Sequence, residues 1–575
     1  MVLRVLFLFF LICYAHPLDA AINCAARRPH RYINECVDLR GETMILDENG
    51  ELCFGPSGKL VNGIVEGHNT SLSGVNKNCF AVVLKGTWKT KTIKDEWFDD
   101  AILTDNQIIQ NINVIQSDNL LQELWIEKNY LLLLDSKWNT GLSLSSNTVL
   151  HFDASISIGG NDLKQYSIVN INRKENVSII GGEIIGDVGK HNYVEGSTSE
   201  WGHGVYIYKS RSIAVSGLKV SKCIGDAFYI SGPSESDINI YDSASKQVVL
   251  KKCIMDSNRR QGISLIHAED VIIEDCLALN MGQIEYTAPS FGLDIEPNKN
   301  NSVRNVRITH FVTENTKADC SVSSGGYQTN GIVSNRYNIL FEKCKFDKSM
   351  AIMSGGVAVV DSDIPGLVVY PREMPDNPVV FKNCWIEGRG LFFSSRTAGS
   401  FTEGREPSYT FKYCDISPVS VYSYYPALIW GTDVKSLSKI NLLFNNCSIN
   451  LPAGHKKNDL IVGGFDVNCL FKKCTIDASD YSLTTNGLAF DKCHIFCKYI
   501  KVHSLPQQIN VLRKCHITTT DSKDVIKTGI IGNRLDIVGC VFKNEDGRRF
   551  EIPDSVNISG STINSNRFIK SEKDR

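Results

Sequence analysis

Residues Glu200–Gly232 read EWGHGVYIYKSRSIAVSGLKVSKCIGDAFYISG and contain one short pattern twice. The segments His203–Ile207 and Asp226–Ile230 start 23 residues apart, and each is a turn residue followed by an alternating apolar run. Such alternation is typical of a β-strand with one buried face. A strand that returns at this interval predicts a repeat architecture, in which each unit packs on the next one.

Cysteine marks the same repeat further along the chain, always as apolar-x-x-Cys-x-apolar. The last five such cysteines are 27, 19, 22 and 25 residues apart, and they are Cys447, Cys474, Cys493, Cys515 and Cys540. Periods of this length with short strands predict a solenoid of β coils stacked at about 4.8 Å. In FKNCWI (Phe381–Ile386) the residues Phe381, Cys384 and Ile386 should point inward. The repeat cysteines should therefore be buried free thiols, with disulfides restricted to the N-terminal set Cys24, Cys36, Cys53 and Cys79.

Composition excludes several classes of protein. The chain has 575 residues, 42% hydrophobic and 22% charged, with a formal net charge of -2. It is therefore neither a disordered chain nor a polybasic nucleic-acid binder. Residues 1–21 have the layout of a signal peptide, with Arg4, an apolar run to about Tyr14, and small residues before position 22. No later segment is apolar enough to span a membrane, so we expect a secreted, periplasmic or cell-surface protein of undetermined oligomeric state.

From about Asp99 to beyond Cys540 the chain resembles the right-handed parallel β-helix proteins of the pectate-lyase-like superfamily. The rungs NTVLHFDASISIGG (Asn147–Gly160) and ENVSIIGGEIIGD (Glu175–Asp187) carry this resemblance. It implies an all-β solenoid with a short N-terminal capping helix, where Ala101, Ile108, Ile112 and Ile115 have helical spacing. The expected organisation is a signal peptide (1–21), a β-rich segment (22–98), a parallel β-helix (99–565) and a tail (566–575). The segment 22–98 is either a small β module or an early partial coil.

Aligning the turns of four coils predicts two faces of one sheet. Alternation places one set of residues inside, namely Val205, Phe228, Ile263 and Leu293. It places a second set outside in one column, namely Tyr206, Tyr229, Ser264 and Asp294. A further outer column is Tyr208, Ser231, Ile266 and Glu296, and the turn before each strand holds His203, Asp226, Gln261 and Phe291. Aromatic rings that stack on sugars, beside carboxylates and arginines, suit a polysaccharide.

An insertion and a set of short motifs add to this face. Gly181–Gly204 contains Asp187, His191 and Glu200 in a long loop that could form one wall of a groove. The motifs NRRQG (Asn258–Gly262) and GLDIEP (Gly292–Pro297) resemble those of β-helix proteins associated with bacterial polysaccharides. The paired Asp-Asp turn and Arg-x-Lys motif of pectin-degrading glycosidases of this fold are missing, as is the Asp-Pro-His motif of alginate epimerases. A zinc site in CHIFCKYIKVH (Cys493–His503) is disfavoured, because Cys493 is already a repeat position.

These observations predict an exported enzyme, a glycoside hydrolase or polysaccharide lyase, that acts on an acidic or neutral polysaccharide. The alternatives are a non-catalytic carbohydrate-binding or adhesion protein and a polysaccharide epimerase. We expect no cofactor, apart from calcium if the protein is a lyase. Asp294 and Glu296 lie two residues apart on one strand, with Cα atoms about 6.6–6.8 Å apart, near the separation that inverting glycosidases use. The catalytic candidates are Asp294, Glu296, Asp226 and His203. The substrate-binding candidates are Tyr206, Tyr229, Arg259, Arg260, Glu200, His191 and Asp187.

Overall fold

The computed structural model divides the chain into two compact units, residues 1–122 and 123–575. The residues that it describes are 29–233, 243–285, 287–298, 301–323, 338–369, 378–387, 391–394, 407–417, 429–432, 440–451, 459–460, 467–485, 488–502, 509–520, 526–528, 534–544, 556–563 and 566–567. The expected signal peptide, Cys24 and His503 lie outside this part of the chain.

The first unit is itself built from stacked parallel strands. β5 pairs in parallel with β2, β3 and β4 on one side and with β6 on the other. His30 pairs with Glu51 and Cys36 with Lys59, which are 21 and 23 positions further along the chain. This offset is that of one coil on the next, which favours the coil over the separate β module. The strands are β1 (His30–Ile33), β2 (Cys36–Asp38), β3 (Thr43–Ile45), β4 (Glu51–Phe54), β5 (Lys59–Ser73), β6 (Phe80–Lys89) and β7 (Thr92–Lys94).

A short helix, α1 (Asp105–Ile115), follows the 3₁₀ turn η1 (Asp95–Trp97). Thr104 and Gln107 form a capping box that starts the helix, so Ala101 lies outside it and is exposed. Ile108, Ile112 and Ile115 are buried, as the spacing predicts. The side-chain amide of Asn111 accepts a hydrogen bond from the backbone N–H of Leu84 and donates one to the carbonyl of Val82. The helix thus supplies hydrogen-bond partners for two backbone groups of β6. Its role as a cap on the solenoid stays a prediction.

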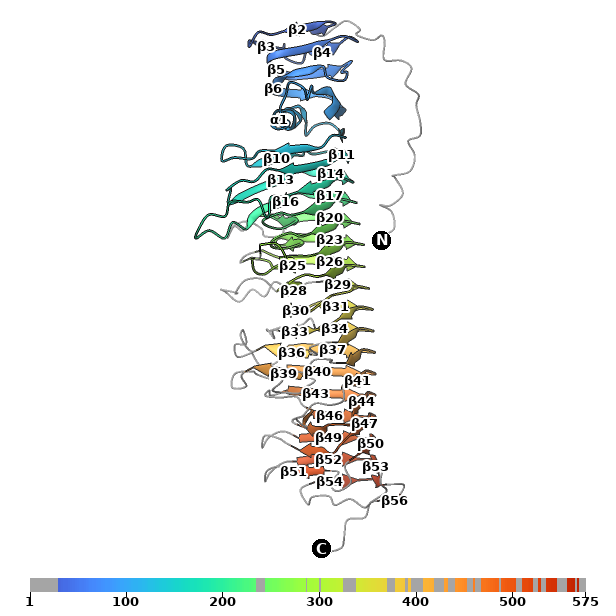
Figure 1. The fold of residues 1–575 in the computed structure, drawn as a ribbon. Coiled ribbons are helices and arrows are strands. Elements are labelled where there is room, and N and C mark those ends of the chain that lie inside the picture. The colour runs from blue at the N-terminus through green and yellow to red at the C-terminus, as the bar shows by residue number, and fades with distance from the viewer. Residues whose placement is uncertain are drawn as a thin grey trace. The chain divides into compact units, whose positions relative to one another are not determined.

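The second unit is a parallel β solenoid whose coils stack from cyan to red in Figure 1. Three sheets run along it, and we call them the long sheet, the site sheet and the lateral sheet. Every pairing in them is parallel except that of β55 with β56. β8 (Gln122–Ile126) spans the division between the units. The long sheet comprises β11 (Thr148–Phe152), β14 (Glu175–Ile180), β17 (Arg211–Ser216), β20 (Ser245–Lys251), β23 (Ala268–Glu274), β26 (Val303–Thr309), β29 (Ile339–Glu342), β31 (Val357–Val360), β34 (Val379–Lys382), β37 (Ser408–Lys412), β40 (Ile440–Asn445), β43 (Val467–Lys472), β46 (Leu488–Asp491), β49 (Ile509–Arg513), β52 (Arg534–Val538) and β54 (Val556–Ser559).

The other two sheets complete each coil. The site sheet comprises β10 (Thr140–Ser143), β13 (Gln165–Asn172), β16 (Trp201–Tyr208), β19 (Phe228–Ser231), β22 (Ile263–Leu265), β25 (Phe291–Ile295), β28 (Ala318–Ser323), β30 (Met350–Met353), β33 (Leu367–Val369), β36 (Leu391–Ser394) and β39 (Ile429–Thr432). The lateral sheet comprises β9 (Tyr130–Leu132), β12 (Ser155–Ile158), β15 (Glu183–Ile185), β18 (Lys219–Ser221), β21 (Ile254–Asp256), β24 (Leu277–Leu279) and β27 (Val312–Glu314). It continues past a bridge at Lys345 as β32 (Asp363–Ile364), β35 (Trp385–Glu387), β38 (Asp415–Ser417), β41 (Ser448–Asn450), β44 (Thr475–Ala478), β47 (His494–Cys497), β50 (His516–Thr519), β53 (Val541–Asn544), β55 (Thr562–Ile563) and β56 (Asn566–Arg567). A shorter sheet holds β42 (Asp459–Leu460), β45 (Ser482–Thr485), β48 (Ile500–Val502) and β51 (Ile526–Thr528).

The core consists of ladders of identical residues, as the cysteine repeat predicts. Phe381 and Phe411 stack with centroids 4.9 Å apart, and the ladder continues to Phe490. The repeat cysteines are buried thiols whose Sγ atoms donate to backbone carbonyls, such as Cys384 to Val359. Trp385 is 48% exposed, which confirms the alternation within FKNCWI. Cys36 and Cys79 are also free thiols, which contradicts a disulfide at either one.

The residue before each repeat cysteine makes the bend between the long and lateral sheets. Asn383, Tyr413 and Lys473 have φ of 52°, 56° and 54°, in the left-handed region. Non-glycine residues rarely adopt this conformation. Because the bend recurs in every coil, inward packing of the flanking phenylalanine and cysteine must offset its cost. This bend orients the strands, and with them the outward side chains of each coil.

Candidate functional site

The site sheet has the register that the repeat predicts. Tyr206 pairs with Tyr229, Tyr229 with Ser264, and Ser264 with Asp294. The inward residues of the same strands, Val205, Phe228, Ile263 and Leu293, have no exposed surface. The four coils therefore place their outward side chains in one column, about 4.8 Å apart from strand to strand.

Most of this outward column is nevertheless covered, so the expectation that it lies open to solvent is wrong. Tyr229 is 8% exposed, Ser264 1% and Asp294 2%. The cover comes from His203 within β16 and from Gln261, which precedes β22. The His203 ring stacks on Tyr229 with centroids 4.5 Å apart, and Gln261 bonds to Asp294. Sequence alternation gives the direction of a side chain and does not show what folds over it.

Asp226 is the most strongly bound carboxylate of the site. It is fully buried, and both of its oxygens accept hydrogen bonds from Nη1 of Arg260, at 3.1 and 3.0 Å. Ser264 Oγ donates to the same carboxylate at 2.9 Å. The Nε atom of Arg260 lies 3.8 Å from Glu200 Oε2. The charge of Arg260 is therefore already balanced by carboxylates of this chain.

His203 lies beside this cluster as a neutral ring. The backbone N–H of Asp226 donates to His203 Nδ1 at 3.2 Å, so the proton of the ring sits on Nε2. The pKa of His203 is lowered to about 4, chiefly by burial and also by Arg260, while the charge of Asp226 acts in the opposite direction. A neutral His203 can donate a hydrogen bond but cannot neutralise a uronate.

Asp294 and Glu296 form a coupled pair of carboxyl groups. Burial raises the pKa of Asp294 well above its usual value, and the charge of Glu296 and a hydrogen bond with it raise it further. Gln261 Nε2 donates to Asp294 Oδ2 at 2.7 Å, which opposes the shift. Asp294 Oδ1 is buried, and among the described residues no donor contacts it. A protonated Asp294 that donates to Glu296 accounts for both observations.

A chain of polar side chains joins the two carboxylate sites. Ser264 donates its one proton to Asp226, its Oγ also contacts Gln261 Oε1, and Gln261 Nε2 donates to Asp294. Ser264 and Gln261 were placed on this face by the repeat but received no functional role from the sequence. The register itself could have indicated them, because Gln261 follows Asp226 by one coil and Ser264 precedes Asp294 by one coil.

The sequence placed His203 and Phe291 in turns, but they lie within β16 and β25, and the glycines on either side of His203 are required by packing. A Cβ at Gly202 would lie 2.3 Å from Ile224 Cγ1, and one at Gly204 would lie 2.3 Å from Val220 Cγ1. Any side chain at these positions would push the strand outward. The two glycines therefore let the backbone of β16 lie close to Ile224 and Val220, and His203 lies between Asp226 and the aromatic rings.

The insertion is fastened to the solenoid by the residues predicted to line its groove. Asp187 is fully buried and accepts from Tyr166 Oη at 2.5 Å and from His191 Nδ1 at 2.8 Å. Arg259 Nη1 donates to the carbonyl of Thr198 at 2.8 Å, and its guanidinium lies over the Tyr193 ring. These contacts position the loop, while Glu200 at its end reaches the Arg260 cluster.

Aromatic rings border the exposed part of the site. Tyr206 and Tyr229 are stacked 5.6 Å apart, and Tyr208 lies 5.7 Å from Tyr206. Trp201, which the sequence reasoning missed, is 42% exposed and contacts the Tyr229 ring edge-on. Glu296 is exposed as well. Trp201, Tyr206, Tyr208 and Glu296 are thus exposed or half-buried side chains that a ligand can reach.

Neither a metal-binding cluster nor a membrane-spanning helix is found among the described residues. No group of three or more metal-ligating side chains is arranged to hold an ion there, and calcium stays a prediction for the lyase alternative. Within the same residues, no helix combines the length and apolar character needed to span a membrane.

A family model described as "Right handed beta helix region" matches residues 204–424. Two proteins of Bacillus subtilis (strain 168) are similar in sequence. YclG is 29% identical over 278 residues, which are 46% of this chain and 44% of that protein. The SPbeta prophage-derived protein YorA is 31% identical over 163 residues, 27% of this chain and 28% of its own. The chain therefore spans less than half of either relative.

Two solved structures share low similarity with the chain. The A-module of the Azotobacter vinelandii mannuronan C-5 epimerase AlgE6 is 12% identical with a TM-score of 0.31, over 77% of this chain and 91% of that one. The tailspike protein of Escherichia coli bacteriophage HK620, in complex with a pentasaccharide, is 12% identical with a TM-score of 0.33. That match covers 83% of this chain and 76% of the tailspike.

Proposed function

We propose that this right-handed parallel β-helix is an exported glycoside hydrolase that binds a neutral polysaccharide along the outer face of the site sheet. Asp294 and Glu296 would supply the proton for cleavage. Trp201, Tyr206 and Tyr208 would stack on sugar rings beside them, since aromatic faces suit the apolar faces of sugars. The fold alone does not imply this chemistry, which rests on the side chains of the site.

The carboxyl pair carries the proposal. A buried acid that shares a hydrogen bond with an exposed carboxylate keeps its proton to a higher pH than a free carboxyl group does, which favours a general acid. The proton would pass to the glycosidic oxygen as the C–O bond breaks, and a water would add to the sugar carbon. The proton that this water loses would restore the pair.

The pair differs in geometry from the expected inverting arrangement. Inverting glycosidases separate their carboxyl groups by about 6.5–9.5 Å to admit a water. Asp294 and Glu296 instead share a hydrogen bond. They therefore resemble two carboxyl groups that hold one proton, and Glu296 is the member that can meet a substrate. Asp226, two strands away at about 9.6 Å, is the further carboxylate of the site.

Both arginines of the site already bind other groups of this chain, which favours a hydrolase of neutral glycans over a lyase. A lyase must stabilise a uronate carboxylate, for which Arg259 and Arg260 were candidates. Arg260 is bound to Asp226 through Nη1, and Arg259 holds the insertion through carbonyls of Thr198 and Ser199. Arg260 is thus paired with carboxylates, while Arg259 keeps its charge but is held by neutral carbonyls and the Tyr193 ring.

A non-catalytic carbohydrate-binding protein is the second candidate. The observation in its favour is burial, because Asp226 and Asp294 are 0% and 2% exposed. A closed polar network of this kind also stabilises a fold. A binder would use the exposed aromatic rings and would leave the carboxyl pair as a structural element.

The test uses Asp294→Asn, because an asparagine amide can accept from Gln261 and donate to Glu296 as the protonated acid does. The variant keeps the hydrogen bonds but has no proton to release. A panel of neutral and acidic polysaccharides should yield new reducing ends with the wild-type protein and no ultraviolet absorbance of unsaturated uronates. Asp294→Asn should lose about a hundredfold or more of the rate while retaining binding.

Three outcomes would contradict the proposal. Ultraviolet absorbance with the wild type would indicate a lyase. Binding without either product would indicate the carbohydrate-binding alternative. Full turnover by Asp294→Asn would remove the pair from the chemistry. Ser321→Ala serves as the matched control, because Ser321 is the next residue of the same column and carries no carboxyl group.

A further inference from the structure

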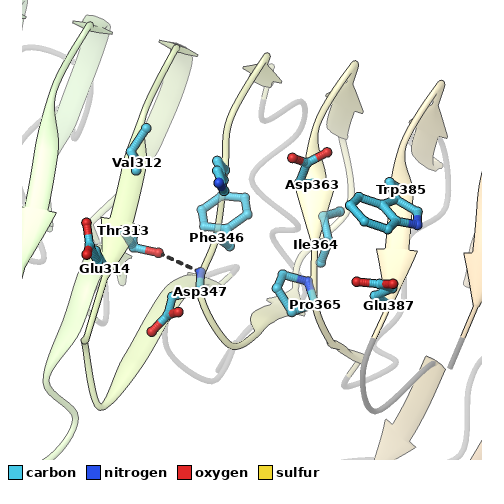
Figure 2. Close-up of a pocket in the computed structure, with 11 residues that line it drawn as sticks. Val312, Thr313, Glu314, Phe346, Asp347, Asp363, Ile364, Pro365, Trp385 and Glu387 are labelled. Atoms are coloured by element: carbon cyan, nitrogen blue, oxygen red, sulfur yellow. Dashed lines mark hydrogen bonds between the residues drawn. The ribbon is translucent and has the colours of Figure 1, made fainter. Parts of the chain in front are cut away.

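A hollow of about 470 Å³ lies on the lateral sheet, on a different face of the coils from Asp294. Figure 2 shows its side chains on successive strand segments, from β27 through residues 345–347 to β32 and β35. None of these residues was assigned a function from the sequence. The lining includes Glu314, Lys345, Asp347, Asp363, Trp385 and Glu387.

The parallel register explains how the charged groups gather there. Lys345 pairs with Asp363, and Asp363 pairs with Trp385, so these three form one outward column. Two residues further along each strand, alternation returns to the outside and forms a second column with Glu314 and Glu387. Pro365, at the end of the two-residue strand β32, is short and leaves the hollow between the longer side chains.

The hollow carries four carboxylates and one ammonium group, which is a net charge of about -3 at neutral pH. Within the described residues the side chains of Glu314, Asp363 and Glu387 make no hydrogen bond or ion pair. Trp385 is 48% exposed beside them. Unpaired carboxylates beside an exposed indole favour a cationic ligand, because the indole face and the carboxylates attract the same charge.

The distribution of the carboxylates favours an extended ligand over a metal ion. They lie on four successive strand segments, which span about 14 Å. Among the described residues no three of them converge as metal ligands. A ligand with several cationic groups along its length would match this spacing.

We propose that the hollow binds an oligosaccharide of amino sugars that carry free ammonium groups, with Trp385 as the stacking platform. The sugar ring would lie on the indole, and its ammonium would face Asp363 and Glu387. This site is separate from the proposed catalytic site and does not depend on its activity. It would hold a partly cationic polysaccharide on the lateral face of the solenoid.

The test measures binding of a glucosamine oligomer and of its N-acetylated counterpart by calorimetry. The wild type should bind the free-amine oligomer at least about tenfold more tightly, and the difference should shrink in high salt. Trp385→Leu should weaken binding of the free-amine oligomer about tenfold. Asp363→Asn and Glu387→Gln should each weaken it about two- to fivefold.

Lys345→Ala provides the sharpest control, because it should strengthen the same binding. Removal of the one cation leaves the attraction to an ammonium group unopposed. Tyr413→Ala removes an aromatic residue that is 57% exposed outside the hollow, and it should change nothing. All variants should keep the thermal midpoint, since the replaced side chains are exposed or half-buried.

Three results would overturn the proposal. Equal affinity for the N-acetylated oligomer would remove the role of the ammonium group. No response to Trp385→Leu would place binding elsewhere. Tighter binding of a lysine-rich peptide than of the oligosaccharide would identify the partner as a basic peptide. Because turnover is not measured, none of these results bears on Asp294, and failure of the Asp294→Asn test leaves the hollow unaffected.

Discussion

The Nδ1 atom of His203 accepts a hydrogen bond from the backbone N–H of Asp226 at 3.2 Å. This contact joins two residues that occupy the same repeat position on successive coils. It requires an unprotonated Nδ1, and burial lowers the pKa of His203 to about 4. His203 is therefore a pH-sensitive part of the site, even though it faces Asp226 and Arg260.

A first prediction concerns the stability of the protein in acid. Because the folded state lowers the pKa of His203 from 6.5 to about 4, the ring contributes its full stability above pH 6.5 and loses it as the pH falls toward 4. His203 contributes about 3 kcal/mol to the free energy of unfolding in this way. His203→Gln should reduce the loss of stability between pH 7 and pH 4. Thermal midpoints of both proteins across this range measure it, and parallel curves would show that His203 does not contribute.

A second prediction concerns the ion pair beneath His203. Arg260→Gln leaves the buried Asp226 carboxylate without its charged partner and should destabilise the protein by about 3–5 kcal/mol. Asp226→Asn in the same background should restore most of that stability, because it removes the unpaired charge. Urea denaturation of the single and double variants measures the coupling. An additive double variant would show that the two side chains do not interact.

The inward-facing residues of the site sheet could be predicted from the sequence, because their direction depends only on the alternation of side chains along a strand. Alternation places Val205 and Phe228 in the core, and the recurring turns fix which coils are neighbours. The cysteine contexts gave the same result for the later coils, since the small thiol fits a ladder position. Local pattern and packing agree at these positions, so the register follows.

The outward half could not be predicted in the same way. Its environment depends on the rotamers of turn residues, and Gln261 folds over Asp294 while Arg260 folds onto Asp226. The Cα spacing of Asp294 and Glu296 likewise did not reveal that their carboxyl groups share a hydrogen bond. The hollow around Trp385 depends on the short strand β32, which no sequence pattern marks.

A third prediction separates two tyrosines that the sequence treats alike. Tyr229 is 8% exposed and stacks on His203, so Tyr229→Ala should destabilise the protein by about 3 kcal/mol. Tyr206 is half-buried, so Tyr206→Ala should weaken oligosaccharide binding and lower the thermal midpoint less. Calorimetric binding and thermal unfolding of both variants test this. Equal loss of stability in the two would show that Tyr206 is a packing residue.

The last prediction concerns the pH dependence of turnover by the carboxyl pair. The proposed acid must be protonated, so the rate should fall as the pH rises through the pKa of Asp294. Burial raises that pKa first, and the charge of Glu296 raises it further. Glu296→Gln removes the charge but not the burial, and it should move the alkaline limb of the rate profile to lower pH. Its remaining rate should be low, because the exposed group that meets the substrate is lost.

Ser321→Ala is the matched control for this profile, because it alters the same column without touching the pair. Its alkaline limb should coincide with that of the wild type. A limb that stays in place in Glu296→Gln would mean that Glu296 does not set the protonation of Asp294. A limb that moves to higher pH would mean that the rate depends on a different acid, since loss of a neighbouring negative charge can only make Asp294 ionise more readily.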